Sequence, residues 1–472
     1  MKEQQIPEIV YRIGDLADQQ GIGCYLVGGY VRDMLMQRPC SDIDIMVTGD
    51  PVAFARLVHQ ELQGKNFALF ERFRTAQFEL PLSAESSIKI ELVGARKESY
   101  NSNSRKPVTL IGTVADDLAR RDFTINALAL VLNAEHRNTI IDHYHGMDDM
   151  EHKILRTPLD ARQTFADDPL RMMRAARFAA QLEFRLLPGI TDAMTEMHER
   201  IRIVSMERVS LEFLKIMHAP KPSIGLEILY RTSLLETILP EVAAMAGIEQ
   251  VDGMEHKDTL FHTFKVIDNV ARQSDNLWLR VAALLHDIAK PVTKRFSKRQ
   301  GWTFHGHDAV GTKIVPKIFR AMRWPNEPME YVSALVRLHH RPIPLSRDEI
   351  SDSAIRRLMF DAGEHLMDLM TLCRADVTSK NPKKVMKIMS NFNLVESKIT
   401  EVGEKDLLAR WRPPVSGADI MEILGLPEGK MIGMIKKQME NAIIDGIIPY
   451  DKEAALNYVK QVYGELLRNE PS

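Results

Sequence analysis

Residues 26–51 read LVGGYVRDMLMQRPCSDIDIMVTGDP and combine two short apolar runs with a pair of glycines and a pair of aspartates. The run CYLV predicts a strand that leads into Gly28 and Gly29, and a helix opening with YVRD follows. The next predicted strand carries Asp42 and Asp44, whose side chains share one face because strand side chains alternate. Neighbouring carboxylates suit Mg²⁺, and glycines before a helix N-terminus let a triphosphate approach backbone amides. The stretch therefore predicts a magnesium and nucleotide site on an α/β sheet, although an isolated pair of aspartates is also common on exposed strands.

The composition is that of an ordinary globular chain. Its 472 residues exceed what one hydrophobic core usually holds, so we expect several domains. Lysine and arginine total 62 against 64 for aspartate and glutamate, which excludes the general basic excess of small nucleic-acid-binding domains. Any such binding would use local patches, and two candidates that can equally be solvated faces are Lys294, Arg295, Lys298 and Arg299, and Lys380, Lys383, Lys384 and Lys387.

The location of the protein is also suggested by composition. No apolar run approaches the roughly 20 residues that cross a bilayer, and the N-terminal residues have helical period rather than the pattern of a signal peptide. The three cysteines, Cys24, Cys40 and Cys373, lack the spacing of zinc or disulfide frameworks. We therefore expect a cytoplasmic protein that does not enter a membrane.

The secondary-structure signals change near residue 150. Before it, helices alternate with β-rich runs such as FRTAQFEL and IKIELVGA, whereas later stretches such as DPLRMMRAARFAAQLEF have helical period. Proline and glycine mark further boundaries. We expect an α+β fold with an elongated helical tail, divided into a head over 1–150, a helical neck over 151–246, a third domain over 247–390 and a helical tail over 391–472.

Two motifs of the head resemble known nucleotidyltransferases. The form GGxVRDxL…DxD resembles the DNA polymerase beta superfamily, and RRDFTINA at 120–127 resembles class II tRNA nucleotidyltransferases and bacterial poly(A) polymerases. This resemblance implies a polymerase-beta-like head that extends an RNA 3′ end by two-metal nucleotidyl transfer with Mg²⁺. It makes Asp42 and Asp44 the catalytic metal ligands, and Glu91, on a later strand, stands where the superfamily often has a third carboxylate.

The same motifs suggest the nucleotide contacts. Arg121 can hold phosphate through charge-assisted hydrogen bonds, and Asp122 and Asn126 can hold ribose hydroxyls. The alternative for these residues is an arginine–aspartate ion pair that caps a helix. The resemblance adds Gly28, Gly29 and Arg32 to the nucleotide site.

Residues 164–184, TFADDPLRMMRAARFAAQLEF, resemble the nucleotide-selecting EDxxR helix of this family. If the two acids mark the helix start, Asp167 and Arg171 are four residues apart on one face. Cytosine and adenine present an amine donor beside a ring-nitrogen acceptor, whereas uracil and guanine present the reverse, so a carboxylate beside a guanidinium accepts C and A. The family usually has Glu in place of Asp167, so Asp168 with Arg171 is the alternative pair, and Arg174 is a further candidate for phosphate or solvent.

A second set of candidate site residues follows the order H…HD…H…H…D between His262 and Asp376. Its members resemble the HD phosphohydrolase superfamily, which places an HD domain over 247–390. Imidazoles suit Mn, Fe, Co, Ni or Zn, and bridging carboxylates support a binuclear centre that activates water for phosphoester hydrolysis. One hypothesis is that the domain hydrolyses phosphates at RNA 3′ ends. The alternative is that the HD fold has only a structural role. The candidate ligands are His262, His286, Asp287, His307, either His339 or His340, and Asp376.

The head motifs do not separate tRNA nucleotidyltransferases from poly(A) polymerases. The polar stretch between Arg96 and Arg120 has the length and place of the flexible loop of full CCA-adding enzymes, and the tail lacks a strongly basic extension. We therefore expect addition of CCA to tRNA from CTP and ATP. A bacterial poly(A) polymerase is the enzymatic alternative, and an HD phosphohydrolase or RNA-binding module with a silent head is the alternative of another class.

Overall fold

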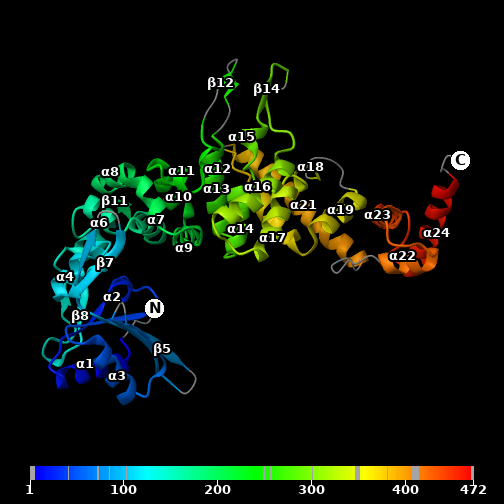
Figure 1. Ribbon diagram of the computed structural model, residues 1–472. Helices are drawn as coiled ribbons and strands as arrows, with labels where there is room; N and C mark the ends of the chain where they lie inside the picture. Colours follow the sequence, from blue (N-terminus) through cyan, green and yellow to red (C-terminus); the bar gives the residue numbers. More distant parts are fainter. Residues whose placement is uncertain are drawn as a thin grey trace. The chain divides into compact units, whose positions relative to one another are not determined.

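The computed structural model forms two compact units, Met1–Pro240 and Glu241–Ser472 (Figure 1). The residues that it describes are 6–40, 42–71, 74–83, 86–101, 104–247, 250–251, 254–255, 258–299, 301–345, 351–379, 381–406 and 414–468.

A seven-stranded mixed sheet forms the centre of the first unit. β2 and β5 run parallel, and the other neighbouring strands pair antiparallel. The strand predictions made from CYLV, DIDIMV, FRTAQFEL and IKIELVGA are confirmed. The spatial order is β3 (Lys65–Phe70), β4 (Thr75–Pro81), β5 (Ser87–Gly94), β2 (Ile43–Val47), β1 (Cys24–Val27), β8 (Ala129–Val131) and β9 (Ile140–Ile141).

The alternation of side chains on β2 positions the acidic residues. Ile43 and Ile45 are fully buried in the main core of the unit, which also contains residues of α1 (Glu8–Gln19) and α3 (Pro51–Glu61). Because side chains alternate along a strand, Asp44 points to the opposite face of the sheet. On that face it has Met46 beside it, within a second, smaller core. Burial of Ile43 and Ile45 thus accounts for the direction of Asp44, and Asp42 lies just before the strand.

The polar stretch after Arg96 is partly a hairpin rather than the loop that the sequence led us to expect. β6 (Arg96–Asn101) pairs antiparallel with β7 (Ser104–Ile111). α4 (Val114–Ala119) then begins at a capping box in which Thr113 and Asp116 satisfy each other's backbone amides. The residues RKPVTLI on β7 include β-branched side chains that favour strands, which explains the difference.

The rest of the first unit is mainly helical, as predicted. A short parallel pair joins β10 (Ile154–Leu155) to β11 (Arg185–Leu186). α7 packs against α9 and α10. The other elements are α2 (Gly29–Leu35), η2 (Thr124–Asn126), η3 (Ala134–His136), α5 (Gly146–Glu151), α6 (Ala161–Asp167), α7 (Leu170–Leu182), α8 (Pro188–Met197), η4 (His198–Ile203), α9 (Met206–Met217), α10 (Pro222–Arg231), α11 (Leu234–Ile238) and α12 (Pro240–Ala243).

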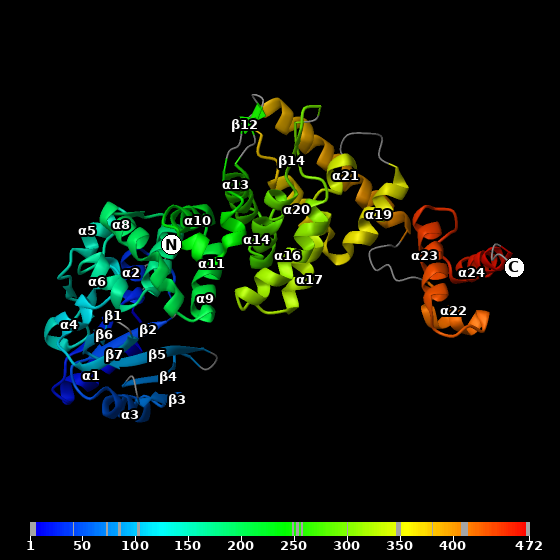
Figure 2. The same cartoon turned by 45° about the horizontal axis from the view of Figure 1, so that its top comes forward.

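The second unit is a helical assembly with two short hairpins, β12 (Gln250–Val251) with β13 (Met254–Glu255) and β14 (Arg295–Ser297) with β15 (Gly301–Thr303). α14 is buried along most of its length and packs against α13, α17 and α20 (Figure 2). The helices are α13 (Thr259–Ala271), α14 (Leu277–Leu285), α15 (Lys290–Thr293), α16 (His307–Ala321), α17 (Glu327–Leu338), α18 (Pro342–Leu345), α19 (Asp352–Ala362), η5 (Gly363–His365), α20 (Leu366–Ala375), α21 (Pro382–Asp406), α22 (Gly417–Leu424), α23 (Lys430–Ile444) and α24 (Lys452–Arg468).

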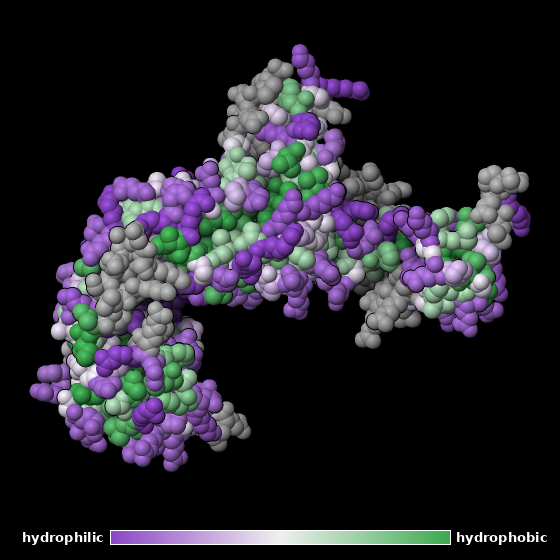
Figure 3. All heavy atoms as spheres, viewed as in Figure 1, coloured by the Kyte–Doolittle hydropathy of each residue, from purple (hydrophilic) through white to green (hydrophobic). Residues whose placement is uncertain are grey.

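The α+β fold class expected from the sequence is confirmed. None of the helices in the described parts of the chain combines the length and the hydrophobicity that a membrane crossing needs. On the face drawn in Figure 3, hydrophilic and hydrophobic residues are interspersed.

Candidate functional site

Three carboxylates lie on or beside β2 and β5, two neighbouring strands in the interior of the head sheet. Asp44 on β2 lies directly opposite Glu91 on β5, and the exposed Asp42 precedes β2. Gln77 on β4 donates from Nε2 to Glu91 Oε2 over 2.7 Å. Burial raises the pKa of Asp44 to about 6, with the charge of Glu91 adding to the rise and Arg121 opposing it. Such a partly buried, mutually repelling set of oxygens is stabilised by a divalent cation, so the residues fit the metal that the sequence implied.

The turn before α2 brings the backbone close to these carboxylates. Gly28 has φ 73° and ψ −138°, a backbone conformation that L side chains rarely adopt. A Cβ at Gly28 would lie 2.9 Å from Arg121 Nη1 and 3.4 Å from Asp44 Oδ2. Gly29 then begins α2. The backbone at Gly28 thus lies against both the carboxylate of Asp44 and the guanidinium of Arg121, with no space for a side chain.

A chain of hydrogen bonds joins four of the residues expected to bind nucleotide. Arg32 Nη1 donates to Asn126 Oδ1 over 2.7 Å, and Asn126 Nδ2 donates to Asp122 Oδ1 over 2.9 Å. Arg174 approaches Asp122 Oδ2 with Nε at 2.7 Å and Nη2 at 2.6 Å. Burial alone would raise the pKa of Asp122, but Arg174 and Asn126 hold it at about 2. Arg32, Asp122, Asn126 and Arg174 therefore orient one another as a largely buried cluster.

Asp117 is a residue of this site that the sequence analysis did not single out. Its carboxylate is fully buried and accepts from Arg120 through Oδ1 and from Arg121 through Oδ2, with Arg121 Nη2 at 3.0 Å. The signal was present, because Asp117 precedes Arg121 by four residues, the spacing of helical ion pairs. Asp117 therefore orients Arg121 toward the glycine turn.

The segment that contains Asp167 and Arg171, for which the sequence predicts a nucleotide-selecting role, differs from the single helix that we expected. Asp167 ends α6, Asp168 has extended backbone with φ −142° and ψ 103°, and α7 begins at Leu170. The prediction that Asp167 and Arg171 lie four apart on one helix is wrong, because proline disfavours helical backbone at the residue before it, here Asp168 before Pro169.

Arg171 and Asp168, which lie beside the break between α6 and α7, form hydrogen bonds with several other segments. Arg171 donates to two backbone carbonyls, Thr164 at 3.3 Å and Arg120 at 2.5 Å. Asp168 accepts from the amide of Leu170 at 3.1 Å and from Arg208 Nη2 at 3.2 Å. Arg171 thus links α7 to the RRDFTINA motif by a hydrogen bond to Arg120. Arg208 on α9 contacts Asp168 and was not singled out in the sequence.

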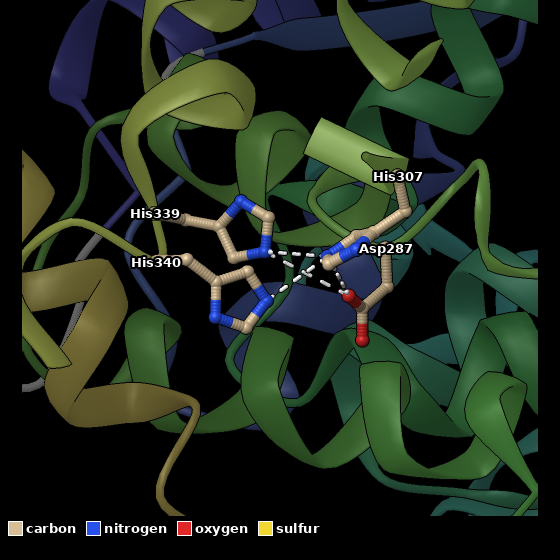
Figure 4. A group of neighbouring side chains, drawn as sticks. All are labelled: Asp287, His307, His339 and His340. Atoms are coloured by element: carbon tan, nitrogen blue, oxygen red, sulfur yellow. Dashed lines mark hydrogen bonds and ion pairs between the residues drawn. The ribbon is translucent and has the colours of Figure 1, made fainter. Parts of the chain in front are cut away.

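The histidines and aspartates of the second unit converge from five helices and their ends. Two groups form, each with ligand atoms close enough to hold one ion. Figure 4 shows the rings of His307, His339 and His340 directed toward one another and toward Asp287. The sequence left His339 and His340 as alternatives, and the structure places both in the cluster. The first group is His262, His286 and Asp376, and the second is Asp287, His307, His339 and His340.

Asp287 lies between the two groups. Its Oδ2 is 3.2 Å from His286 Nε2, and its Oδ1 is 3.5 Å from His307 Nε2 and 3.7 Å from His339 Nε2. Asp376 Oδ1 is 2.8 Å from His262 Nε2 and 3.6 Å from His286 Nε2. A carboxylate with one oxygen directed to each group is the arrangement of a bridging ligand in a binuclear centre.

The hydrogen bonding of these rings fits metal binding. The Nδ1 atoms of His286, His307 and His339 each meet a backbone carbonyl within 2.7–2.8 Å, which directs every Nε2 into the cluster. His286 Nε2 and Asp287 Oδ1 are buried without a hydrogen-bond partner. Burial lowers the pKa of His340 to about 4, and the neighbouring His339 and His307 act in the same direction, so the ring is neutral and able to donate a lone pair.

Comparison with known proteins assigns both sites to described domains. The model of the poly A polymerase head domain matches residues 24–156, that of a probable RNA and SrmB-binding site of polymerase A matches 183–245, and the HD domain matches 259–380. The fold and the carboxylates of Asp42, Asp44 and Glu91 thus define a polymerase-beta-like nucleotidyltransferase head joined to helical and HD domains.

The similar curated proteins cover most of the chain. The multifunctional CCA protein of Shewanella frigidimarina is 31% identical over 75% of this chain and 84% of its own length. The A-adding tRNA nucleotidyltransferase of Deinococcus radiodurans and the CC-adding one of Thermus thermophilus are each 29% identical, over 92% and 91% of this chain and 94% and 91% of their own lengths. The chain belongs to the family of class II CCA-adding enzymes and bacterial poly(A) polymerases, as a member with an HD domain, which confirms the resemblance seen in the sequence motifs.

Solved structures share the fold. An apo CCA-adding enzyme aligns with a TM-score of 0.65 at 20% identity, covering 98% of this chain and 97% of its own. A tRNA nucleotidyltransferase complexed with a primer tRNA and an incoming ATP analog aligns with a TM-score of 0.58 at 21% identity, covering 82% of this chain and 98% of its own. Membership of this family implies use of divalent metal ions by the head and the HD domain.

Proposed function

We propose that this chain adds C and A residues to the 3′ end of tRNA from CTP and ATP and completes the CCA sequence. The observation that carries the proposal is the juxtaposition of Asp44, Glu91, the Gly28 turn and Arg121 beside the interior strands β2 and β5. Asp42, Asp44 and Glu91 would hold Mg²⁺, which when bound lowers the pKa of the RNA 3′-hydroxyl and neutralises the pyrophosphate leaving group.

The other residues of the head bind and orient the nucleotide. Arg121, held by Asp117, binds triphosphate oxygens beside the backbone of Gly28 and the start of α2. Asp122 and Asn126 accept and donate hydrogen bonds to the ribose hydroxyls, and Arg32 and Arg174 keep them in place. The adjoining segment with Asp167, Asp168 and Arg171 selects cytosine and adenine through its carboxylate and guanidinium groups.

Incubation with tRNA that lacks its CCA end, and in parallel with an unrelated RNA, tests this function. CTP and ATP are supplied singly and together with Mg²⁺, and product lengths are read on a sequencing gel. Three added nucleotides on tRNA alone support the proposal. Addition of only C or only A residues would assign the chain to the partial activities in the names of two relatives, and long A tails on either RNA would identify a poly(A) polymerase.

A second function has its own supporting observation. Asp287 directs one carboxylate oxygen to each of two ligand groups, and two of the polar atoms between them are buried without a hydrogen bond. We propose that the HD domain binds Mn, Fe, Co, Ni or Zn and hydrolyses a phosphate or 2′,3′-cyclic phosphate at RNA 3′ ends. In the cyclic case the water oxygen bonds to phosphorus, one ring P–O bond breaks, and the released ribose oxygen takes a proton.

The hydrolytic function is tested on a chain whose head is disabled. Asp42→Ala with Asp44→Ala should still open a cyclic phosphate substrate to the phosphomonoester, and further substitution of His286→Ala with Asp287→Ala should abolish that ring opening. If none of the five metals supports hydrolysis by the first variant, the second function is rejected while the first is untouched.

A further inference from the structure

A two-stranded hairpin lies in the chain between the metal-ligand candidates Asp287 and His307. Its strands are β14 and β15, which pair antiparallel. The short helix α15 separates β14 from Asp287, and on the other side the chain passes from β15 through Phe304 to His307, where α16 begins. In both views the hairpin stands out from the helices of the second unit (Figure 1 and Figure 2). The segment that carries two ligand candidates thus also carries a projecting element.

Direct contacts fix the base of this hairpin to the metal centre. His307 Nδ1 lies 2.8 Å from the carbonyl oxygen of Phe304, the residue that follows β15. Lys290 Nζ lies 2.5 Å from Asp287 Oδ2 and 5.7 Å from the centroid of the Phe304 ring. Because both ends of the hairpin are tied to residues beside the ligands, its starting point relative to the centre is defined.

An aromatic pair stiffens the hairpin. Phe296 on β14 lies directly opposite Trp302 on β15, and the two rings meet edge to face with their centroids 5.1 Å apart. Lys294 Nζ lies 4.4 Å from the centroid of the Trp302 ring. A two-stranded hairpin is marginally stable by itself, and a cross-strand aromatic pair is the kind of contact that stabilises it. Side chains alternate along a strand, so Arg295 points to the face opposite the aromatic pair.

The remaining side chains of the hairpin give it a strong positive charge. Residues 294–303 read KRFSKRQGWT, with four cations and no aspartate or glutamate, although the whole chain has a net charge of -2. An ordinary solvated surface interleaves both signs of charge. The basic cluster that the sequence left as either a binding patch or a solvated face is therefore gathered, without acidic residues, on one projecting element.

Three of these cations are available to a ligand. Arg295, Lys298 and Arg299 are exposed, and Lys298 and Arg299 lie in the turn that joins the two strands. Within the described parts of the chain, none of the three forms an ion pair with a carboxylate. At about 3.3 Å per residue, the distance from Arg295 to Lys298 is roughly 10 Å, over which a nucleic-acid strand presents several phosphates. The hairpin therefore suits an extended polyanion better than a single small anion.

We propose that the β14–β15 hairpin binds the phosphate backbone of the RNA whose 3′ end reaches the HD domain, through Arg295, Lys298 and Arg299. The inference rests on the proposed function, because tRNA is the polyanion that the chain would take as substrate. An RNA with its end at the metal centre has to leave that centre past residues that flank the hairpin. Contacts of this kind are made to phosphate, so they position the RNA without reading its sequence.

Fluorescence anisotropy of a labelled tRNA that lacks its CCA end, titrated with the full-length chain at several salt concentrations, tests the proposal. Lys298→Ala with Arg299→Ala should weaken binding by about tenfold at low salt, because two phosphate contacts are lost. The slope of log affinity against log salt concentration should become shallower by about 1.4–1.8. A purely structural role of the turn would leave this slope unchanged, since the slope counts the counterions that binding releases.

Two further variants separate phosphate binding from other effects. Lys317→Ala with Arg320→Ala is the matched control, because it removes one lysine and one arginine from exposed positions of α16. This control should keep the affinity and the salt slope of the unsubstituted chain. Lys298→Arg with Arg299→Lys keeps both charges and should also bind normally.

Several outcomes of these titrations would overturn the proposal. Normal binding by the hairpin alanine variant would do so, as would an equal loss in the α16 control. A loss in the charge-exchanged variant as large as that in the alanine variant would show that charge is not what the RNA recognises. If vesicles containing phosphatidylglycerol, and not tRNA, bind in a way that depends on Lys298 and Arg299, the hairpin contacts a membrane surface instead.

Kinetics on a chain with Asp42→Ala and Asp44→Ala distinguish this inference from the hydrolytic function. For a cyclic phosphate at the end of tRNA, the hairpin alanine variant should raise KM by about tenfold with kcat unchanged, as loss of uniform binding requires. A mononucleoside cyclic phosphate should show no change. If no metal supports ring opening but tRNA affinity still depends on the hairpin, only the hydrolytic function is rejected. If ring opening proceeds with an unchanged KM for tRNA, the hairpin assignment is wrong.

Discussion

Asp44 on β2 faces Glu91 on β5 in direct parallel register, so that two carboxylates from strands 47 residues apart in sequence lie side by side. This pairing is sustained at some electrostatic cost, because burial and the charge of Glu91 both raise the pKa of Asp44. Binding of a cation would offset this unfavourable electrostatic free energy. Substitutions at this pair can therefore distinguish an effect on metal binding from an effect on folding.

Replacing Asp44 by Asn should reduce nucleotide addition by roughly 10²–10³-fold or more, since it removes a charged ligand at the point where transition-state charge develops. Glu91→Gln should cost less, because its neighbour Gln77 can still form a hydrogen bond to the new side chain. Gln77→Ala, which removes only that neighbour, should change the rate by a few-fold at most. Single-turnover addition of [α-³²P]CTP to tRNA measures all three, and an unchanged rate in Asp44→Asn would contradict the assignment.

Gly28→Ala should impair nucleotide binding as well as folding. The substitution forces a Cβ to within 2.9 Å of Arg121 Nη1 at a backbone angle that costs about 1–3 kcal/mol for non-glycine residues. We expect a raised KM for CTP and a lower thermal midpoint. Gly29→Ala is the control, because its Cβ would meet nothing nearer than Arg32 Nη2 at 3.6 Å. Equal kinetics in the two variants would show that the turn does not approach the nucleotide.

Asp117→Asn should destabilise the head although the residue touches no proposed substrate. The fully buried carboxylate neutralises Arg120 and Arg121, and removing one partner of such a buried pair commonly costs about 3–5 kcal/mol. Solvent around the two arginines reduces the expected loss to roughly half of that. Urea unfolding measures the loss, and KM for CTP should rise with it because Arg121 is no longer oriented. A variant as stable as the original chain would refute this role.

The ion pair between Asp122 and Arg174 should make the first unit sensitive to acid. The carboxyl pKa is lowered from an unfolded value of about 3.9 to about 2, so the folded state holds fewer protons over that interval. The contribution is present above about pH 4 and is lost as the pH falls toward 2, amounting to about 2–3 kcal/mol. Asp122→Asn should flatten this part of the stability profile. Unfolding midpoints measured from pH 5 to 2.5 compare the two chains, and parallel profiles would contradict the prediction.

The sequence predicted the elements of the head better than their junctions. Alternation of Ile43 and Ile45 with aspartates was enough to predict that Asp44 points away from the main core. The resemblance to known nucleotidyltransferases suggested Glu91 as a third carboxylate, but local sequence alone does not predict its pairing with Asp44. α3, β3 and β4 intervene, and only the sheet order brings the two strands together. The start of α7 was misplaced because the effect of Pro169 on the backbone of Asp168 outweighs the helical period of the flanking residues.

In the second unit, too, the sequence predicted the residues of the site but not how the fold brings them together. The order of histidines and aspartates identified the ligand candidates, but only folding shows that the consecutive His339 and His340 both reach the cluster. Lys384 and Lys387 lie in a basic run that by itself resembles a solvated face. Their place in the wall of the same cavity as His262 depends on how α21 packs against α20, which local sequence does not encode.

Metal content should reveal Asp287 as a bridging ligand. Because its two oxygens are directed to different groups, Asp287→Ala should remove nearly all transition metal from the HD domain. His262→Ala and His340→Ala each disturb one group, so each should lower the content from about two ions per chain to about one. Mass spectrometry of protein dialysed against excess metal gives the stoichiometry, and Lys383→Ala serves as a control that retains both ions. If His262→Ala and His340→Ala each abolished all binding, the centre would hold a single ion shared by both groups.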